Sequence, residues 1–233
     1  MKEDIKTNYS QVLYVSSFEE LVTTSFIGEV NAICWKRQLD GDFEEIVSQN
    51  ALEENIIELN EKVLLKLNLS AKGQLAREVI LNDFRLLKTH GALPCLNVIK
   101  CYDRDEEKVI ISTDVYSFHV DSSPVPIDTF LCTYYGESSD ILPNEQAEQK
   151  VLIPSIREEL KKNYAKGDNG FELYLSENCY DLHYQAKSNA KPISLGIGYL
   201  WRLATLHPES KVLPCIHRAP MEKEGQLRLM MIC

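Results

Sequence analysis

Hydrophobic residues recur at helical spacing in the first third of the chain. Two runs place an apolar residue at every third or fourth position, which is the spacing of one buried helix face. The residues of the first run are Leu52, Ile56, Leu59 and Val63. Those of the second run are Leu75, Val79, Ile80, Phe84 and Leu87. Gly91, which closely precedes Pro94, is a typical end signal for the second helix.

Two shorter elements are predicted before these helices. The sequence from Ser17 to Glu20 has the form of a capping box, in which Ser17 accepts from first-turn amides and Glu20 reaches back. We therefore expect a short helix that ends near Thr24. Residues 30–36 are rich in β-branched and aromatic side chains, which favours a strand. The first ten residues have the composition of a polar tail.

The pattern changes near Pro94, where short strand-like runs replace the helical spacing. Turn residues separate most of these runs. The predicted strands cover residues 97–102, 109–119, 128–135, 171–175, 181–185, 193–203, 212–217 and 227–233. A charged helix predicted over residues 145–164 interrupts the series. Many short strands at nearly regular spacing favour a sandwich or a barrel, so the predicted class is α+β.

Length and composition are those of a soluble globular protein. The chain has 233 residues, of which 44% are hydrophobic and 26% are charged, and this excludes a collagen-like or wholly disordered chain. We expect a single domain over residues 1–233. Within it, residues 1–94 form a mainly helical part, and residues 95–233 form the β-rich core.

The net charge and the lack of membrane or export signals limit the kinds of partner that are expected. The net charge of −10 disfavours a nucleic-acid-binding surface, because such surfaces are cationic. No apolar run is long enough for a transmembrane helix, and no signal-peptide core follows the polar start. A cytoplasmic protein with no membrane partner is therefore expected. Seven cysteines without a C-x-x-C pair favour free thiols over a disulfide framework. The oligomeric state is not predicted.

The candidate chemistry is concentrated around His119 and Asp121. Residues two apart on a strand point to the same face, with Cα atoms about 6.6 Å apart, so both side chains can bind one cation. His217 ends another apolar run 98 positions later, and Arg228 follows 11 residues after it. Two imidazoles and one carboxylate leave open positions on an octahedral ion, as in non-haem iron(II) oxygenases. Zinc more often takes a third histidine or a thiolate.

This order of His-x-Asp, a distant second histidine and a basic residue on the next strand resembles that of the iron(II)- and 2-oxoglutarate-dependent oxygenases. The resemblance covers about residues 95–233. The chain is also similar to a bacterial family of uncharacterised proteins in the blocks 132–136, 217–220 and 228–229. The oxygenase resemblance implies a double-stranded β-helix, a cupin-like jelly roll with the metal inside. The helical N-terminal part would pack on it as a layer.

The resemblance also implies the role of each residue in this pattern. His119, Asp121 and His217 bind iron(II), and Arg228 binds the distal carboxylate of the co-substrate 2-oxoglutarate. A guanidinium suits that task because it offers two parallel donors. The implied activity is a dioxygenase that hydroxylates or oxidises an unknown substrate, either a small molecule or a protein side chain. The carboxylate of Asp121 disfavours halogenation, since halogenases of this superfamily have a small residue in its place.

Alternation along the strands bears on the co-substrate site. Arg228, Met230 and Ile232 share one face of their strand, and Arg228 reaches inward if that face lines the barrel. Tyr134 and Tyr135 lie on the strand after the His-x-Asp strand, and one of them is expected to face inside. A phenol there can hydrogen-bond the co-substrate carboxylate. Alternation does not predict which of the two faces inside.

Other functions would use the same residues differently. A non-catalytic jelly-roll protein could hold a divalent ion for metal handling or sensing, without a co-substrate on Arg228. A metal-free interaction protein would keep His119 and Asp121 as a structural pair. A further alternative is an iron oxygenase that uses no 2-oxo acid. Arg228 could also be a surface residue paired with Glu222 or Glu224.

The remaining polar residues have weaker claims to a functional role. His183 and His207 have no partner at ligand spacing. Arg218, next to His217, can meet a substrate at the barrel mouth or lie in an exposed loop. Trp201 is expected in the core, as is usual for tryptophan in a strand.

Overall fold

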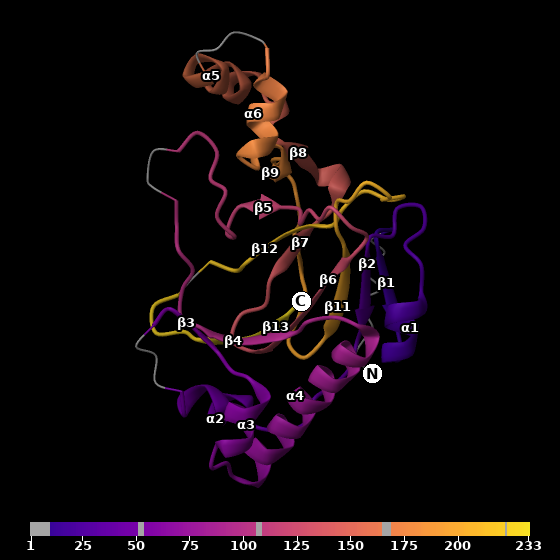
Figure 1. Ribbon diagram of the computed structural model, residues 1–233, viewed down its shortest axis with the longest axis vertical. Helices are drawn as coiled ribbons and strands as arrows, with labels where there is room; N and C mark the ends of the chain where they lie inside the picture. The colour runs from indigo at the N-terminus through magenta and orange to yellow at the C-terminus, as the bar shows by residue number, and fades with distance from the viewer. Residues whose placement is uncertain (1–9, 51–53, 106–108, 165–168, 222) are drawn as a thin grey trace.

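Two β-sheets form the centre of the computed structural model, which describes residues 10–50, 54–105, 109–164, 169–221 and 223–233 (Figure 1). The major sheet has seven strands, in spatial order β1 (Val12–Val15), β2 (Ala32–Trp35), β11 (Leu200–Ala204), β6 (Asp128–Tyr135), β13 (Arg228–Ile232), β4 (Cys95–Ile99) and β3 (Ile56–Glu58). The minor sheet has six, in order β10 (Ile193–Ser194), β7 (Asp140–Leu142), β12 (Ile216–Arg218), β5 (Phe118–His119), β9 (His183–Ala186) and β8 (Ala147–Gln149).

Helices accompany both sheets, which confirms the predicted mixed α+β class. The α-helices of the described residues are α1 (Phe18–Thr23), α2 (Phe43–Ser48), α3 (Glu61–Lys66), α4 (Ala71–His90), α5 (Pro154–Tyr164) and α6 (Phe171–Glu177). Short 3-10 turns form η1 (Asn144–Gln146), η2 (Lys150–Leu152) and η3 (Tyr180–Leu182). Within the described residues, no helix is long and apolar enough to cross a membrane.

The chain passes repeatedly from one sheet to the other. Strands β4, β6, β11 and β13 belong to the major sheet, and β5, β7, β10 and β12 belong to the minor sheet. Each step from β4 to β7, and each step from β10 to β13, therefore changes sheet. The two sheets face each other over a buried apolar cluster that includes Leu131, Trp201 and Met230 of the major sheet and Ile141 of the minor sheet.

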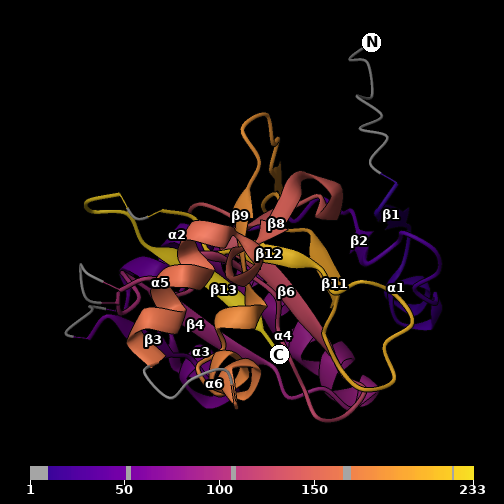
Figure 2. The same cartoon turned by 90° about the horizontal axis from the view of Figure 1, so that it is seen from above.

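The outer face of the major sheet is covered by helices. Cys132 and Leu229 lie on this face and pack in one buried cluster with Ile80 and Leu87 of α4. In Figure 1, α2, α3 and α4 lie on the same side of the sheet. Figure 1 shows α5 and α6 near β8 and β9, at the end of the molecule opposite α2, α3 and α4, and Figure 2 gives the view from above that end.

Local signals locate several element ends correctly. Ser17 caps α1, because its side chain accepts from the backbone N–H of Glu20 at 3.1 Å. The carboxylate of Glu20 accepts from the backbone N–H of Ser16 at 2.7 Å, one residue earlier than a capping box requires. Gly91 ends α4 in the left-handed conformation, with φ 97°.

The helix predicted over residues 52–63 is wrong. Ile56 lies in β3, which pairs with β4. A helix starts only at Asn60, whose side-chain oxygen accepts from the backbone N–H groups of Lys62 and Val63. Leu52 lies outside the described residues. The apolar spacing that spans β3 and α3 was therefore coincidental. Pairing with β4 makes the residues that precede the Asn60 cap a strand.

Two helices occupy the region where one helix and one strand were predicted. The helix predicted over residues 145–164 begins only at Pro154, after η1, β8 and η2. The strand predicted over 171–175 is wrong, because this segment forms α6. Phe171 and Leu175 lie one helical turn apart and both pack into a small cluster with Leu160 of α5.

Two further predicted strands are longer than the observed ones. Of residues 109–119, only Phe118 and His119 form a strand, β5. The run 193–203 is divided into β10 and β11 by Gly196 and Gly198, whose φ angles of 74° and 80° favour glycine. Side chains at those two positions would be strained, so the run cannot continue as one strand.

The N-terminal part contributes to the sheet as well as to the helical layer. β1 and β2 form one edge of the major sheet, and β3 forms the other edge. β1 was not predicted, and it pairs in parallel with β2. The first 94 residues therefore complete both edges of the β-structure that residues 95–233 build.

Candidate metal centre

Three histidines lie in a row across the minor sheet. His119 of β5 is paired with His217 of β12 on one side and with His183 of β9 on the other. Directly paired residues on neighbouring strands point to the same face. Ile141, which is paired with His217, belongs to the buried cluster between the sheets. All three imidazoles therefore lie on the inner face of the minor sheet.

Asp121 joins two of these histidines in a compact group. One ligand atom each from His119, Asp121 and His217 lies within 4.8 Å of the other two. The ring centroids of the two histidines are 4.6 Å apart, and Oδ2 of Asp121 is 3.6 Å from Nε2 of His217. The pairing of β5 with β12 thus brings together the three predicted ligands, although 98 residues separate the histidines.

Backbone carbonyls orient both imidazoles. Nδ1 of His119 lies 2.7 Å from the carbonyl oxygen of Ser117, and Nδ1 of His217 lies 3.2 Å from that of Cys215. A carbonyl only accepts, so each Nδ1 carries the proton and each Nε2 keeps its lone pair. Metal-binding histidines are typically held in this way. Within the described residues neither Nε2 has a hydrogen-bond partner, so both lone pairs are available to a cation.

Asp121 has a separate partner, which argues against a purely structural His119–Asp121 pair. The hydroxyl of Thr129 donates to Oδ2 of Asp121, while His119 uses its Nδ1 on Ser117. Burial, and then the neighbouring His217, lower the pKa of His119. The neutral imidazole is the form that binds a cation, so the environment keeps His119 ready to act as a ligand at neutral pH.

The donor set fits a divalent transition-metal ion. Two imidazole nitrogens and one carboxylate oxygen on one side of an ion leave other positions open. His217 is buried, whereas the side chain of Asp121 is 36% exposed. The group therefore combines two oriented nitrogens with an acidic ligand that solvent can reach.

Arg228 lies inside the molecule at the start of β13. It shares the inner face of that strand with Met230 and is only 8% exposed. Its Nε donates to the carbonyl of Glu137 at 2.7 Å, and its Nη2 donates to Oγ of Ser139 at 3.3 Å. The side chain of Tyr102 also bonds it. The alternative of a surface ion pair is therefore wrong.

The prediction that Tyr134 or Tyr135 faces inside is wrong. A bulge interrupts the pairing of β6 with β13, so that Leu229 pairs with Tyr135 while Met230 pairs with Thr133. Leu229 packs in the helix-covered cluster, and Tyr135 shares its face. The extra residue, Tyr134, packs in the same cluster. A bulge re-aims side chains in a way that strict alternation does not predict.

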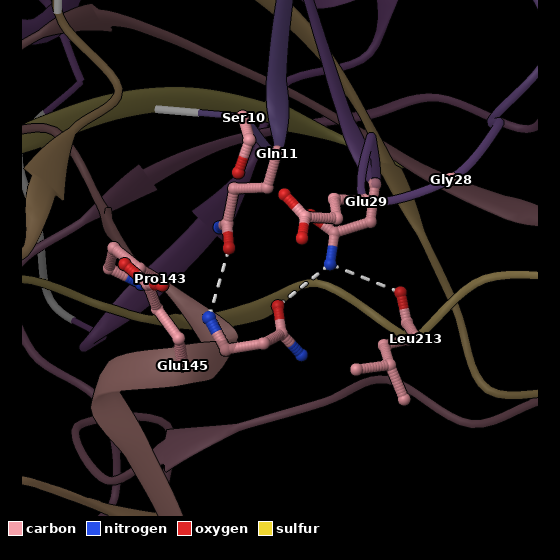
Figure 3. A pocket seen from close by; sticks show the side chains of 9 residues that line it. Ser10, Gln11, Gly28, Glu29, Pro143, Glu145 and Leu213 are labelled. Carbon is pink, nitrogen blue, oxygen red and sulfur yellow. Dashed lines mark hydrogen bonds between the residues drawn. The ribbon is translucent and has the colours of Figure 1, made fainter. Parts of the chain in front are cut away.

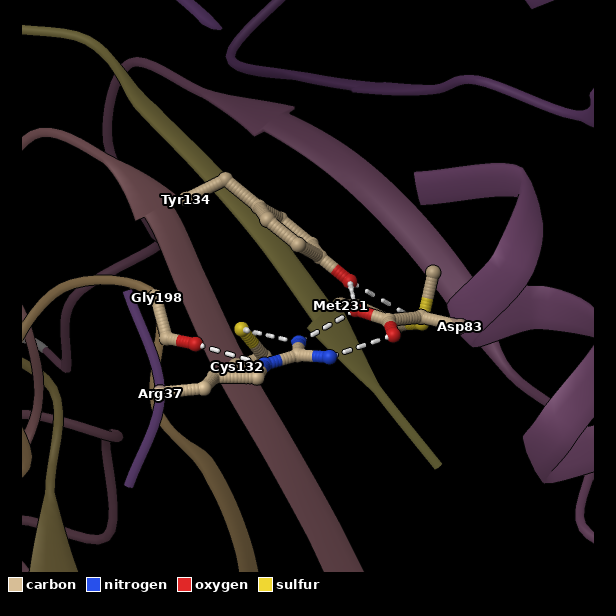
Figure 4. Close-up of polar contacts among 6 residues, drawn as sticks. All are labelled: Arg37, Asp83, Cys132, Tyr134, Gly198 and Met231. Atoms are coloured by element: carbon tan, nitrogen blue, oxygen red, sulfur yellow. Dashed lines mark hydrogen bonds and ion pairs between the residues drawn. The ribbon is translucent and has the colours of Figure 1, made fainter. Parts of the chain in front are cut away.

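The hydroxyl of Tyr134 belongs to a buried ion pair under α4 (Figure 4). It donates to Oδ2 of Asp83 at 2.7 Å, and Asp83 is fully buried. Both oxygens of Asp83 accept from Arg37, with 2.7 Å between Nη1 and Oδ1. Nε of Arg37 donates to the carbonyl of Gly198 at 2.9 Å. Burial and the Asp83 charge raise the pKa of Tyr134 well above its ordinary value, so the phenol stays a donor.

Thr133, which the sequence did not single out, places a second hydroxyl besides that of Thr129 on the inner face of β6. Thr133 is 1% exposed, and its Oγ1 has no hydrogen-bond partner among the described residues. Its pairing partner Met230 shares a face with Arg228. A free hydroxyl and a guanidinium therefore face the same interior. Regular alternation with Leu131 places Thr133 on this face, but the sequence carries no signal for which face of β6 is the inner one.

The other polar candidates have partners that hold the fold. Arg218 pairs with Asp140 at 3.2 Å, and the indole N–H of Trp201 donates to the carbonyl of Leu195 at 2.7 Å. His207 lies in the loop after β11, where its Nδ1 accepts from a backbone N–H two residues later. None of these side chains belongs to the His119–Asp121–His217 group.

A separate polar cavity of about 350 Å³ is lined by residues near β1, β2 and η1 and in the loop before β12 (Figure 3). Side-chain amides cross-link these segments. The backbone N–H of Asn144 donates to Oε1 of Gln11 at 2.9 Å, and Nδ2 of Asn31 donates to Oδ1 of Asn144 at 2.8 Å. These bonds join the N-terminal strands to the minor sheet.

Comparisons with protein-family models, with curated proteins and with solved structures found no match. The geometry of the site consists of a compact His-Asp-His group on the inner face of a curled sheet, and it is compatible with a metal-binding β-sandwich.

Proposed function

We propose that this chain is an iron(II)- and 2-oxoglutarate-dependent oxygenase that hydroxylates or otherwise oxidises its substrate. The observation that carries the proposal is the group of His119, Asp121 and His217, with both Nε2 lone pairs free. Two histidines and one carboxylate with open positions are the typical ligand set of non-haem iron(II) oxygenases. Bound iron(II) would supply the positions at which a 2-oxo acid and dioxygen meet.

The strand order supports the fold that this activity implies. In the major sheet β11-β6-β13-β4 are neighbours, and in the minor sheet β10-β7-β12-β5 are neighbours. Eight antiparallel strands that alternate between two sheets form a jelly roll, and we propose that this core is a double-stranded β-helix. The ligands then come from β5, the turn after it, and β12, on the inner face.

The positions of Arg228 and Thr133 support 2-oxoglutarate as the co-substrate. A guanidinium that is 8% exposed and a buried hydroxyl that no described residue hydrogen-bonds face the same interior. We propose that they hold the distal carboxylate of 2-oxoglutarate, since a carboxylate accepts from both groups. The carbonyls of Ser117 and Cys215 keep the two imidazoles in place, and the apolar cluster around Met230 excludes water from the interior.

Anaerobic titration with iron(II), followed by 2-oxoglutarate, tests the proposal. Wild-type protein should bind one iron(II) and then develop the visible charge-transfer band of a chelated 2-oxo acid. His217→Ala should abolish both signals, whereas His207→Ala, a matched histidine in a surface loop, should keep both. Succinate release is the assay for turnover.

Arginine variants separate the oxygenase from a metal-handling protein. Arg228→Ala should keep iron binding but weaken 2-oxoglutarate binding about tenfold to a hundredfold, the range for a charge-assisted hydrogen bond. Arg85→Ala, on the exposed side of α4, is the control. Iron binding without any band in the wild type would support metal handling instead. No iron binding at all would refute the proposed function.

A further inference from the structure

The third histidine of the row is buried and unused by the ligand group. His183 is 4% exposed, and its ring centroid lies 5.7 Å from that of His119. Its Nδ1 has no hydrogen-bond partner among the described residues. Buried polar atoms usually find a partner, so an orphaned nitrogen beside a candidate metal centre indicates a missing ligand.

A lysine lies beside this histidine. Lys150, the first residue of η2, donates from Nζ to Oγ of Ser117 at 2.7 Å and is half-buried. η2 packs against β9, the strand of His183. Within the described part of the chain, no carboxylate forms an ion pair with Lys150. Because the hydrogen-bond partner of this partly buried cation is a neutral hydroxyl, an anion is the complementary ligand.

The carboxylates of Asp114 and Asp105, whose charges act on both Lys150 and His183, have hydrogen-bond partners of their own. Asp114 accepts from the backbone N–H groups of Tyr116 and Ser117, which fixes a turn. Asp105 accepts from the backbone N–H of Thr113. Both carboxylates therefore hold the loop before β5 in shape, and they act on Lys150 through their charge without forming an ion pair with it.

His119 stands at the centre of this arrangement. Across the sheet, His183 lies on the side of His119 opposite His217. Along the chain, Ser117 with Lys150 lies on the side opposite Asp121. Asp121 and His217 of the ligand group thus lie on one side of His119, and Lys150 and His183 lie on the other. A molecule that extends from Asp121 and His217 across His119 therefore reaches Lys150 and His183.

We propose that Lys150 and His183 bind an anionic oxygen group of the substrate, a carboxylate or a phosphate. The inference rests on the proposed function and defines the substrate class for the same site. Lys150 supplies the charge, and His183 donates a ring N–H to an oxygen. The chain carries a net charge of −10, so a local cation is needed to hold an anion there.

Cobalt(II)-loaded protein tests the inference without knowledge of the substrate. Its visible absorption reports ligands near the metal, and 2-oxoglutarate is added first to occupy the co-substrate site. Acetate and inorganic phosphate are then titrated as probes, with methylammonium as the cationic control. The wild type should respond saturably to at least one anion and not to methylammonium. The response to acetate, compared with the response to phosphate, then distinguishes a carboxylate from a phosphate as the bound group.

Variants assign the response to the two residues. Lys150→Gln should weaken the anion about tenfold or more, His183→Gln should weaken it several-fold, and Lys150→Arg should restore most of the affinity. Lys162→Gln, which removes an exposed charge of α5, should have no effect. Thermal unfolding of each cobalt-loaded variant checks that the fold is retained.

The outcomes separate this inference from the proposed function. Failure of the wild type to bind cobalt(II) would refute the proposed function and the inference with it. Cobalt and 2-oxoglutarate binding with no anion response, or with an equal response in Lys150→Gln and the wild type, would overturn the inference alone. If Lys150→Gln weakens 2-oxoglutarate itself, Lys150 binds the co-substrate and the inference is wrong.

Discussion

Two buried polar groups lie on opposite sides of the major sheet, and they differ in how completely their atoms are paired. On the helix-covered side, both oxygens of Asp83 and three nitrogens of Arg37 have partners within the protein. On the inner side, His119 and His217 each use one nitrogen, and the other has no hydrogen-bond partner among the described residues. Residue type alone would make both groups candidates for function. The pairing indicates that the first stabilises the fold and that the second could hold a metal ion.

Removal of Asp83 should have the largest effect on stability. Asp83→Ala leaves Arg37 buried and unpaired and removes the acceptor of Tyr134. We expect the free energy of unfolding to fall by about 3–5 kcal/mol, measured by urea denaturation. Metal affinity of the folded fraction should be unchanged. A loss below about 1 kcal/mol would contradict the structural role of this ion pair.

Removal of Asp121 should strongly weaken metal binding and leave stability nearly unchanged, which is the opposite of the pattern expected for Asp83. Asp121→Ala takes away one ligand, and even partners behind metal ligands are typically worth tenfold to a hundredfold in affinity. We expect the affinity for a divalent ion to fall by more than about a hundredfold. Because Asp121 is partly exposed, the stability of the metal-free protein should change by less than about 1 kcal/mol. Calorimetric metal titration and urea denaturation of the same samples test both statements.

Acid should lower the stability of the folded protein, because the buried His183 resists protonation. Burial, followed by the neighbouring His119 and Lys150, lowers its pKa to about 4. The unfolded chain takes up this proton near pH 6.5, and the folded protein does so only near pH 4. The contribution of neutral His183 to the free energy of unfolding should therefore be fully present above pH 6.5. It should decrease as the pH falls towards 4, by up to roughly 3 kcal/mol.

The variant His183→Gln isolates this contribution. The difference in unfolding free energy between the metal-free wild type and the variant should change between pH 7 and pH 4.5. A difference that stays constant over this range would show that His183 titrates normally.

The smallest effect concerns the unpaired hydroxyl of Thr133. Thr133→Val keeps the shape and removes a buried polar atom that has no partner among the described residues. We expect unchanged or slightly higher stability, because such an atom is unfavourable in an apolar site. Affinity for 2-oxoglutarate should fall about threefold to tenfold, and Thr133→Ser should retain it. Equal affinity in Thr133→Val and the wild type would remove Thr133 from the co-substrate site.

The sequence predicts those features that depend on neighbouring residues. The start of α1 at Ser17 and the end of α4 at Gly91 follow from local hydrogen bonding and from backbone conformation. β6 has the predicted bounds, Asp128–Tyr135. The segment 171–175 shows the limit of such signals, because a short apolar run fits a strand or a helix until its packing partner is known.

By itself, the sequence also determined the chemical kind of the candidate site. A histidine and an aspartate two positions apart share a face wherever the backbone is extended, so His119 and Asp121 were bound to converge. Tertiary structure decided the rest. The pairing of β5 with β12 and β9 added His217 and His183 to the same row, and a bulge turned Tyr135 to the outer face that Tyr134 already occupies. The register between distant strands depends on how whole sheets pack, and no local segment of the chain carries that information.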